Sequence, residues 1–433
     1  MNVIHPFQAV VSNASGNQIY VVSKSTILAY KYDGKEYRLI GKWVDEVEGN
    51  HNHAPTESKN AKSPSQAKKM RSNGGKSSKK YTSDPLFPII TSQIRKLRLS
   101  SDESKLIACT DSDKSIIILR ILLEGEYEDN CLKLTKRQPF PKRPNALTIT
   151  DREKLIIADK FGDVYEMDAY KDDVQEIKEP ILGHVSMLTD ILFVRDLQGN
   201  KYIITSDRDE HIKISHYPQC YVVDKWLFGH KQFISSLCNP IWKSQWLFSA
   251  GGDECVFAWD WINGEKLAEF NYEKLIQPHL SAAHLASERF QNESNDIIEY
   301  AVSTIVSLHT LPFVAFFVEA TNILIILEVC PNTGVLSLKE TLELPYSIVS
   351  LSESHDELEV TCDNRSAGSD HFVEFITHNK QNNCFEIDTQ RSDSFNRAVA
   401  LTLKDEESVN VGSDDIYPLY NMISLKKHGE HYS

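Results

Sequence analysis

The segment from Gly229 to Asp260 constrains the fold of this chain more than any other. It opens with Gly229-His230, and Trp259 follows that histidine by 29 residues and leads directly into Asp260. Gly-His at the start and Trp-Asp at the end of such a unit are typical of one WD-repeat blade. One blade cannot bury both of its faces, so several must be present. We therefore expect an all-β WD-repeat propeller.

Further copies of the pattern precede this unit. A second pair, Gly183-His184, lies 46 residues before the first, and an acidic turn with Asp209 lies 44 residues before the turn with Asp253. Weaker copies occupy residues 108–118 and 158–168. These spacings fit blades of four short strands.

Four residues of the unit are expected to be linked by hydrogen bonds inside the blade: His230, Ser249, Asp253 and Trp259. Trp donates, Ser donates and accepts, and His bridges to a carboxylate. In the preceding blade, His184 and Asp209 are expected to take the corresponding places. The set also looks like a hydrolase triad, but a nucleophile needs an exposed, strained turn beside an oxyanion hole. Ser249 lies inside a strand pattern, so we predict a structural network and no catalytic residue.

Composition limits the other classes of function. The 433 residues are 41% apolar and 25% charged, which is ordinary for a globular protein. The eight cysteines form no Cys-x-x-Cys pair, so we expect neither a zinc site nor a redox motif, and no metal. No apolar run approaches about 18 residues, and the first residues lack a secretory pattern, so no membrane association is expected. The formal net charge of −14 argues against a chain that grips nucleic acid by itself.

The chain divides into four parts on composition. We expect a first blade in residues 1–45, a disordered basic insertion in 46–85, the other blades in 86–394 and an irregular C-terminal tail in 395–433. Without insertion and tail about 350 residues remain, which at about 45–50 residues per blade gives seven blades. The expected blade cores lie near 15–45, 90–122, 143–169, 185–217, 231–262, 297–330 and 344–378.

The insertion is strongly basic. Between Ser58 and Lys80 it carries eight Lys and Arg residues and no acidic residue, and it is almost free of large apolar side chains. Such a segment cannot bury enough apolar surface to fold. The cluster at 68–71 fits a nuclear-localisation signal or a loop that touches RNA. A merely solvated loop explains it equally well.

Several segments go beyond a generic repeat pattern, and they occur in a fixed order: 142–146, 158–165, 182–190 and 204–218. Ordinary WD repeats do not carry Asp-Arg-Asp-Glu at a turn, as 207–210 does. The series resembles the WD-repeat, non-catalytic subunit of the eukaryotic tRNA (guanine-N(7)-)-methyltransferase in its fungal form. The resemblance runs from the N-terminus to the last residues.

The resemblance implies a scaffold in a two-subunit enzyme. The partner would carry the S-adenosylmethionine-binding domain, so this chain would need no cofactor. It would hold the catalytic subunit in an active conformation in a heterodimer, and the complex would methylate a guanine in the tRNA variable loop. This chain would meet tRNA mainly through the complex, which is expected in the nucleus.

Charge density suggests where the partner docks. Arg208 and Lys213 are the best candidates for ion pairs with an acidic partner surface, together with the turn residues Asp207, Glu210 and His211. Charged pairs at an interface fix its register. A self-contained surface ion pair is the plainer alternative. A second candidate pair, Lys142-Arg143, fits contact with RNA or with protein.

Two other functions are open to a chain of this kind. A general WD-repeat adaptor, for example in a ubiquitin ligase or a chromatin complex, would have a different stable partner. A propeller enzyme with a site in its central channel would be active alone, but no residues in the sequence suit such a site.

Overall fold

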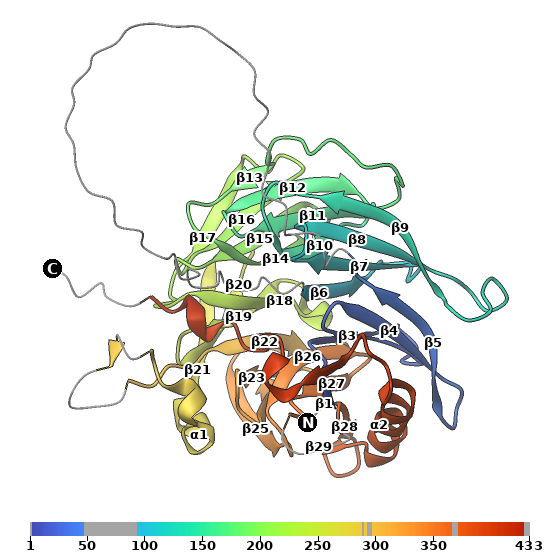
Figure 1. Ribbon diagram of the computed structural model, residues 1–433. Coiled ribbons are helices and arrows are strands. Elements are labelled where there is room, and N and C mark those ends of the chain that lie inside the picture. The colour runs from blue at the N-terminus through green and yellow to red at the C-terminus, as the bar shows by residue number, and fades with distance from the viewer. Residues whose placement is uncertain (1, 47–92, 288–289, 292–296, 366–370, 428–433) are drawn as a thin grey trace, which may run out of the picture.

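The computed structural model describes residues 2–46, 93–287, 290–291, 297–365 and 371–427 of the chain. The predicted insertion at 46–85 lies, except for Glu46, outside these residues, as does the basic cluster at 68–71. The described residues form seven four-stranded antiparallel sheets arranged in a ring, which confirms the predicted propeller (Figure 1). In every sheet the order of the strands in space is their order in the sequence.

The first three blades precede residue 184. Blade 1 contains β2 (Ala9–Ser12), β3 (Gln18–Ser23), β4 (Thr26–Tyr32) and β5 (Tyr37–Val44). Blade 2 contains β6 (Ile94–Leu99), β7 (Lys105–Thr110), β8 (Ser115–Ile121) and β9 (Leu132–Pro139). Blade 3 contains β10 (Pro144–Ile149), β11 (Lys154–Asp159), β12 (Asp163–Asp168) and β13 (Leu182–Gly183).

The other four blades follow in the same way. Blade 4 contains β14 (Leu188–Arg195), β15 (Lys201–Asp207), β16 (Ile212–Tyr217) and β17 (Val223–Leu227). Blade 5 contains β18 (Ile234–Cys238), β19 (Trp246–Gly251), β20 (Cys255–Asp260) and β21 (Glu265–Asn271). Blade 6 contains β22 (Val302–Ser307), β23 (Phe313–Val318), β24 (Ile323–Val329) and β25 (Leu336–Glu343). Blade 7 contains β26 (Ile348–Ser354), β27 (Glu357–Cys362), β28 (Val373–Asn379) and β29 (Cys384–Ile387).

The middle strands of the blades form the core. Strands such as β7, β19 and β23 are buried along their whole length because neighbouring blades cover both of their faces. The fourth strands are more polar and lie at the rim; most residues of β17 are exposed. The predicted cores of blades 2 to 7 therefore contain the first three strands and stop before the fourth, while the core predicted at 15–45 contains β5 and misses β2.

The two ends of each blade carry different segments of the chain. Because the strands are antiparallel, the turn between the second and third strand and the connection to the next blade lie at the same end of every blade. We call the surface formed by these turns and connections the connection face. All candidate partner-binding residues of the sequence lie on it or next to it.

The ring closes without a shared strand. The first strands contact one another in sequence, and β26 of blade 7 packs against β2 of blade 1. Helix α2 (Thr389–Leu403) covers this junction and contacts β28 and β5 (Figure 1). From it, Arg391 pairs with Glu357 and donates from its Nε to the Tyr37 hydroxyl at 2.6 Å. β1 (Asn2–Ile4) also pairs with β30 (Asn410–Gly412).

The first part of the predicted irregular tail at 395–433 is regular, because residues 395–403 belong to helix α2. Helix α2 begins at Thr389, before the predicted boundary, and its buried Phe395, Val399 and Leu403 recur every four residues. Asp388 caps it by accepting from the Arg391 N–H at 3.0 Å. The helical period was present in the sequence, but it lay in a region assigned to a tail.

The remaining helices are short and lie outside the sheets: α1 (Glu273–Ile276) and the 3-10 turns η2 (Ile241–Lys243), η3 (Gln277–His279), η4 (Ala282–His284), η6 (Ser413–Asp415) and η7 (Ile423–Leu425). None of the described helices is long and apolar enough to cross a bilayer.

Candidate partner-binding surface

The predicted network forms in blade 5. The Trp259 indole donates to the Ser249 hydroxyl at 2.8 Å, and that hydroxyl lies 2.7 Å from His230 Nε2. The other ring nitrogen of His230 bonds to the Asp253 carboxylate. Ser249 is completely buried, so its hydroxyl is not available to a substrate. The network holds the second and third strands to the connection that enters the blade.

Blade 4 builds a related network with another acid. His184 bonds through Nδ1 to Asp207 at 2.8 Å and through Nε2 to the Thr205 hydroxyl at 2.7 Å. The other Asp207 oxygen accepts the backbone N–H of Asp209 and of His211. The prediction that Asp209 belongs to the internal network is therefore wrong. Asp207 ends its strand and reaches both His184 and the turn, which leaves Asp209 at the surface.

Electrostatics follow from this burial. Burial alone would raise the pKa of Asp207, but the hydrogen bond with His184 lowers that pKa below its usual range. Burial lowers the pKa of His184, so its imidazole is kept neutral. Asp207 is 2% exposed and already holds three partners, so it is not a free carboxylate for a second protein.

Lys213 is not the exposed cation that the sequence predicted. Its side chain is almost buried, and Nζ donates to the backbone oxygen of Gly183. The same ammonium lies 5.3 Å from the centre of the Trp226 ring. Burial lowers the pKa of Lys213. The residue therefore stabilises the inside of blade 4, one layer below the surface.

The tip of the turn is charged and partly exposed. Arg208 donates from its Nε to the backbone oxygen of Leu425 at 2.9 Å. Lys427 lies 2.9 Å from Asp209 and 3.9 Å from Glu210. A segment near the C-terminus thus lies against this turn, which the sequence did not suggest.

An aromatic patch continues from this turn. We define it as four exposed apolar residues on blades 3 and 4: Phe161, Val185, Trp226 and Phe228. Trp226 and Phe228 stack with ring centres 6.3 Å apart, and the His211 ring meets both edge-on. Val185 is fully exposed and Phe228 is 67% exposed. Exposed apolar groups gathered in one place mark interaction surfaces.

Gly162 allows the turn with Phe161 to pack against the connection with Val185. Gly162 follows Phe161, has φ +106°, and lies so close to the connection at His184 that a Cβ would be 2.4 Å from the His184 oxygen. Only glycine combines that φ with that approach. The turn carrying Phe161 is therefore pressed against the connection carrying Val185.

Cations surround the patch. Lys142 lies 4.3 Å and Lys160 lies 5.7 Å from the centre of the Phe161 ring, within range of cation–π attraction. Arg143 turns inward, with its Nη1 3.5 Å from Asp111, and burial lowers its pKa. Of the two residues predicted to touch RNA, Lys142 is exposed and Arg143 is not.

Sequence reasoning missed the aromatic residues. A signal existed for two of them: Trp226 lies in the rim strand β17, where polar residues are the rule, and Phe228 follows that strand directly before Gly229-His230. The stacking of the two rings places both side chains on the same side. Phe161 also occupies the tip of a turn, where a large apolar residue does nothing for the fold.

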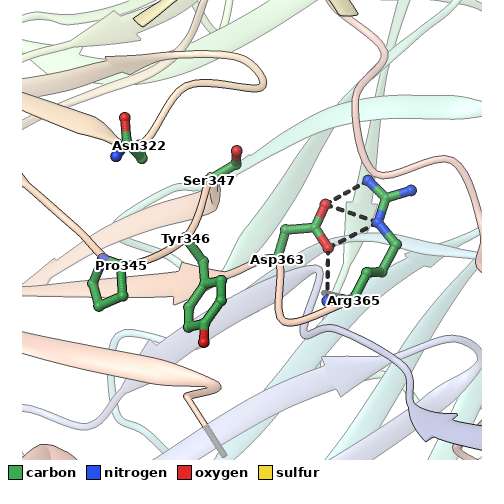
Figure 2. A pocket seen from close by; sticks show the side chains of 6 residues that line it. All are labelled: Asn322, Pro345, Tyr346, Ser347, Asp363 and Arg365. Carbon is green, nitrogen blue, oxygen red and sulfur yellow. Dashed lines mark hydrogen bonds and ion pairs between the residues drawn. The ribbon is translucent and has the colours of Figure 1, made fainter. Parts of the chain in front are cut away.

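The pocket between blades 6 and 7 does not resemble an active site. A pocket of about 360 Å³ opens between blades 6 and 7, and its lining residues are Asn322, Pro345, Tyr346, Ser347, Asp363 and Arg365 (Figure 2). Its two charged residues are paired with each other, with Arg365 Nε 2.8 Å from an Asp363 oxygen. Across the described residues there is also no group of three His, Cys, Asp or Glu side chains suited to a metal ion.

Fold and surface together define a class: a WD-repeat propeller that presents an exposed aromatic patch with two lysines beside it. A family model described as the tRNA methyltransferase TRM82 WD40 domain matches residues 13–179 and 168–385. The chain belongs to this family.

Full-length relatives agree with that assignment. The tRNA (guanine-N(7)-)-methyltransferase non-catalytic subunits TRM82 of Vanderwaltozyma polyspora and Saccharomyces cerevisiae are 49% and 47% identical to this chain, and each match covers 100% of both sequences. Among solved structures, U3-55K superposes with a TM-score of 0.56 at 13% identity over 85% of this chain and 93% of that one. The WD40 repeats of RRP9 give a TM-score of 0.56 at 14% identity, over 85% of this chain and 92% of that one. At such identities these two structures support the fold alone.

Proposed function

We propose that this chain is the non-catalytic scaffold of a heterodimeric tRNA (guanine-N(7)-)-methyltransferase. Full-length similarity to subunits with that name is the observation that carries the proposal. The catalytic subunit binds S-adenosylmethionine, and this chain holds it in an active conformation while the complex methylates a guanine in the tRNA variable loop. The chain itself needs no cofactor.

The catalytic subunit docks on the connection face of blades 3 and 4. Two features support this site: the aromatic patch offers large rigid side chains, and Arg208 lies beside it at a charged turn. Aromatic residues and arginine dominate the binding energy of protein interfaces. The partner surface that fits here is apolar at its centre and acidic where it meets Arg208 and Lys160.

The test is tRNA nucleoside analysis. Deleting this chain in a fungal host is expected to abolish 7-methylguanosine in tRNA, and the wild-type chain is expected to restore it. The tagged chain should copurify with one methyltransferase subunit in a 1:1 complex. Intact 7-methylguanosine after deletion would contradict the proposal. A different stable partner would favour a general adaptor of a ubiquitin ligase or chromatin complex, a class that the family match does not support.

tRNA is reached mainly through the complex, with Lys142 as the contact from this chain. Because one phosphate contact changes the slope of log affinity against log salt by about one, Lys142→Ala should lower that slope by about one in the purified complex. Lys133→Ala, an exposed lysine on the rim strand β9, is the matched control. An unchanged slope would remove Lys142 from the RNA surface.

The complex acts in the nucleus, and the basic residues 58–80 are the proposed import signal. A fluorescent fusion with Lys68, Lys69 and Arg71 changed to alanine should remain in the cytoplasm. Unchanged nuclear fluorescence would contradict this role.

A further inference from the structure

The last described residues form a strap across the connection face. We define the strap as residues 416–427. It begins beside blade 1, where the Tyr417 N–H donates to His5 Nε2 at 3.0 Å. It then passes blade 7, where the Tyr420 hydroxyl donates to Asp363 at 3.1 Å. It ends at the charged turn of blade 4, more than 200 residues earlier in the sequence.

Glu319 of blade 6 fixes the middle of the strap. Its carboxylate accepts three successive backbone N–H groups, from Asn421, Met422 and Ile423, at 2.9, 2.8 and 3.0 Å. The side chain is 3% exposed. Burial raises the pKa of this carboxyl group, and the three N–H bonds oppose that shift. A buried carboxylate with three backbone donors specifies one conformation of the strap, because any other leaves the acid without partners.

The end of the strap lies on the residues expected to meet the catalytic subunit. Lys426 is anchored 5.0 Å from the centre of the Tyr300 ring. Its neighbour Leu425 accepts from Arg208 Nε, while Lys427 pairs with Asp209. The hydrogen bond from Nε to the Leu425 oxygen therefore fixes the guanidinium group of Arg208. Its two terminal nitrogens make no hydrogen bond or ion pair with any described residue.

We propose that the strap is part of the docking surface and positions Arg208 for a carboxylate of the catalytic subunit. This inference rests on the proposed function, because it assumes that the catalytic subunit docks at blade 4. Guanidinium groups bind carboxylates through two parallel N–H donors, which requires a fixed orientation of the side chain. The Leu425 oxygen supplies that orientation, and Lys427 neutralises Asp209, which would otherwise repel an acidic partner.

A prearranged strap also changes the energetics of binding. Ordering a long side chain and a loop during association weakens the affinity, and a surface ordered in advance avoids that loss. Here the ordering happens when the propeller folds, through Glu319. The strap therefore acts on the affinity for the partner without supplying the partner's main apolar contacts, which come from the aromatic patch.

The test compares two buried acids. Glu319→Gln replaces one of the two accepting oxygens by an NH2 group, which cannot accept a strap N–H group. Hydrogen exchange at 421–423 should therefore accelerate. Affinity for the purified methyltransferase subunit should fall about tenfold, since an unordered loop must be ordered on binding. Glu359→Gln is the matched control: Glu359 is equally buried, but it joins Ser12 and Ser352 and does not touch the strap. Its exchange at 421–423 and its affinity should equal those of the wild type.

Lys427→Glu serves as a second variant, because a partly exposed lysine can be changed without unfolding the ring. It should weaken binding in the same direction as Glu319→Gln. Faster exchange in the strap with unchanged affinity, while Arg208→Glu still weakens binding, would overturn the strap proposal and leave the proposed function intact. Tighter binding of the methyltransferase subunit by Glu319→Gln or Lys427→Glu would also overturn it, since the strap would then compete with that subunit. Failure of the wild-type chain to bind any methyltransferase subunit would instead contradict the proposed function itself.

Discussion

Blades 4 and 5 are neighbours with the same strand arrangement, but they close their networks in different ways. In blade 5, His230, Ser249 and Trp259 form a continuous buried chain of hydrogen bonds. In blade 4, Ser215 stands in the place of the tryptophan, and its hydroxyl is buried without a hydrogen-bond partner among the described atoms. The large indole reappears as Trp226 on the rim strand, where it is 38% exposed.

The difference shows how a repeat protein separates folding from binding. Blade 5 keeps its aromatic side chain inside and gains stability from it. Blade 4 carries Trp226 and Phe228 outside, together with a charged turn. Its inner network, centred on Asp207, needs no tryptophan. The departure from the repeat therefore exposes aromatic side chains, which we propose bind the partner, while the fold is kept.

The strongest test of this comparison is a pair of substitutions at corresponding positions. Trp259→Ala should destabilise the protein by about 3–5 kcal/mol, because it leaves a cavity and removes the indole N–H that Ser249 accepts. Ser215→Ala should be neutral or slightly stabilising, because it removes a buried hydroxyl that lacks a partner. Chemical denaturation of both variants measures the difference. Equal losses would show that the two blades depend on this position alike.

The next effect concerns binding. Phe228→Ala should weaken the affinity for the methyltransferase subunit by about 2 kcal/mol, roughly 30-fold, as for an aromatic anchor of an interface. The melting temperature should not change, because Phe228 is two-thirds exposed. Tyr221→Ala, an exposed aromatic in the turn between β16 and β17 at the opposite end of blade 4, is the control and should bind normally. Normal binding by Phe228→Ala would move the interface away from blade 4.

Substitutions of Lys213 test whether the buried side chains of blade 4 are needed for partner binding at its surface. Lys213→Glu should reduce copurification of the methyltransferase subunit and also destabilise the chain by about 1–3 kcal/mol, since it buries a second acid near Asp207. Lys213→Met keeps the length and the contact with Trp226 and should lose less stability. Comparing pull-downs with denaturation curves separates the two effects. A fully stable Lys213→Glu protein would contradict the buried position.

The smallest expected effect is the pH dependence of blade 4. Burial holds the pKa of His184 below 6.5, so the unfolded chain binds a proton that the folded chain does not. Stability therefore rises with pH through this window and falls as the pH drops below about 6.5. Hydrogen exchange between pH 7.5 and 5.5 should show blade 4 opening faster at the acid end, and His184→Gln should lack that part of the dependence. Identical pH profiles for both proteins would exclude the effect.

The fold could be predicted from the sequence because each repeat has a local sequence pattern. The apolar middle strands, the Gly-His pairs and the network of His230 with Trp259 were all readable one blade at a time. Except for β5, the fourth strands were not, because strands such as β17 lie at the rim and are mostly exposed. Helix α2 was missed although Phe395, Val399 and Leu403 have helical spacing, since the region was judged by its position near the C-terminus.

The site was predicted only in part. The turn at 207–211 and Lys142 were found from charge, and Arg208, Glu210 and Lys142 do lie at the surface. Two features could not be predicted: that Asp207 and not Asp209 pairs with His184, and that Lys213 is buried. Both depend on where side chains point at the end of a strand. A one-dimensional pattern does not contain that information.

By itself, the sequence determined the class of architecture, the number of blades and the family, because these depend on repeats and motifs that are local along the chain. The tertiary structure alone decided how the ring closes and what the connection face presents. Arg391 and helix α2 replace a shared strand, and the strap brings Leu425 to Arg208. The physical reason is that such contacts join residues hundreds of positions apart, and their energies appear only once the ring has brought those residues together.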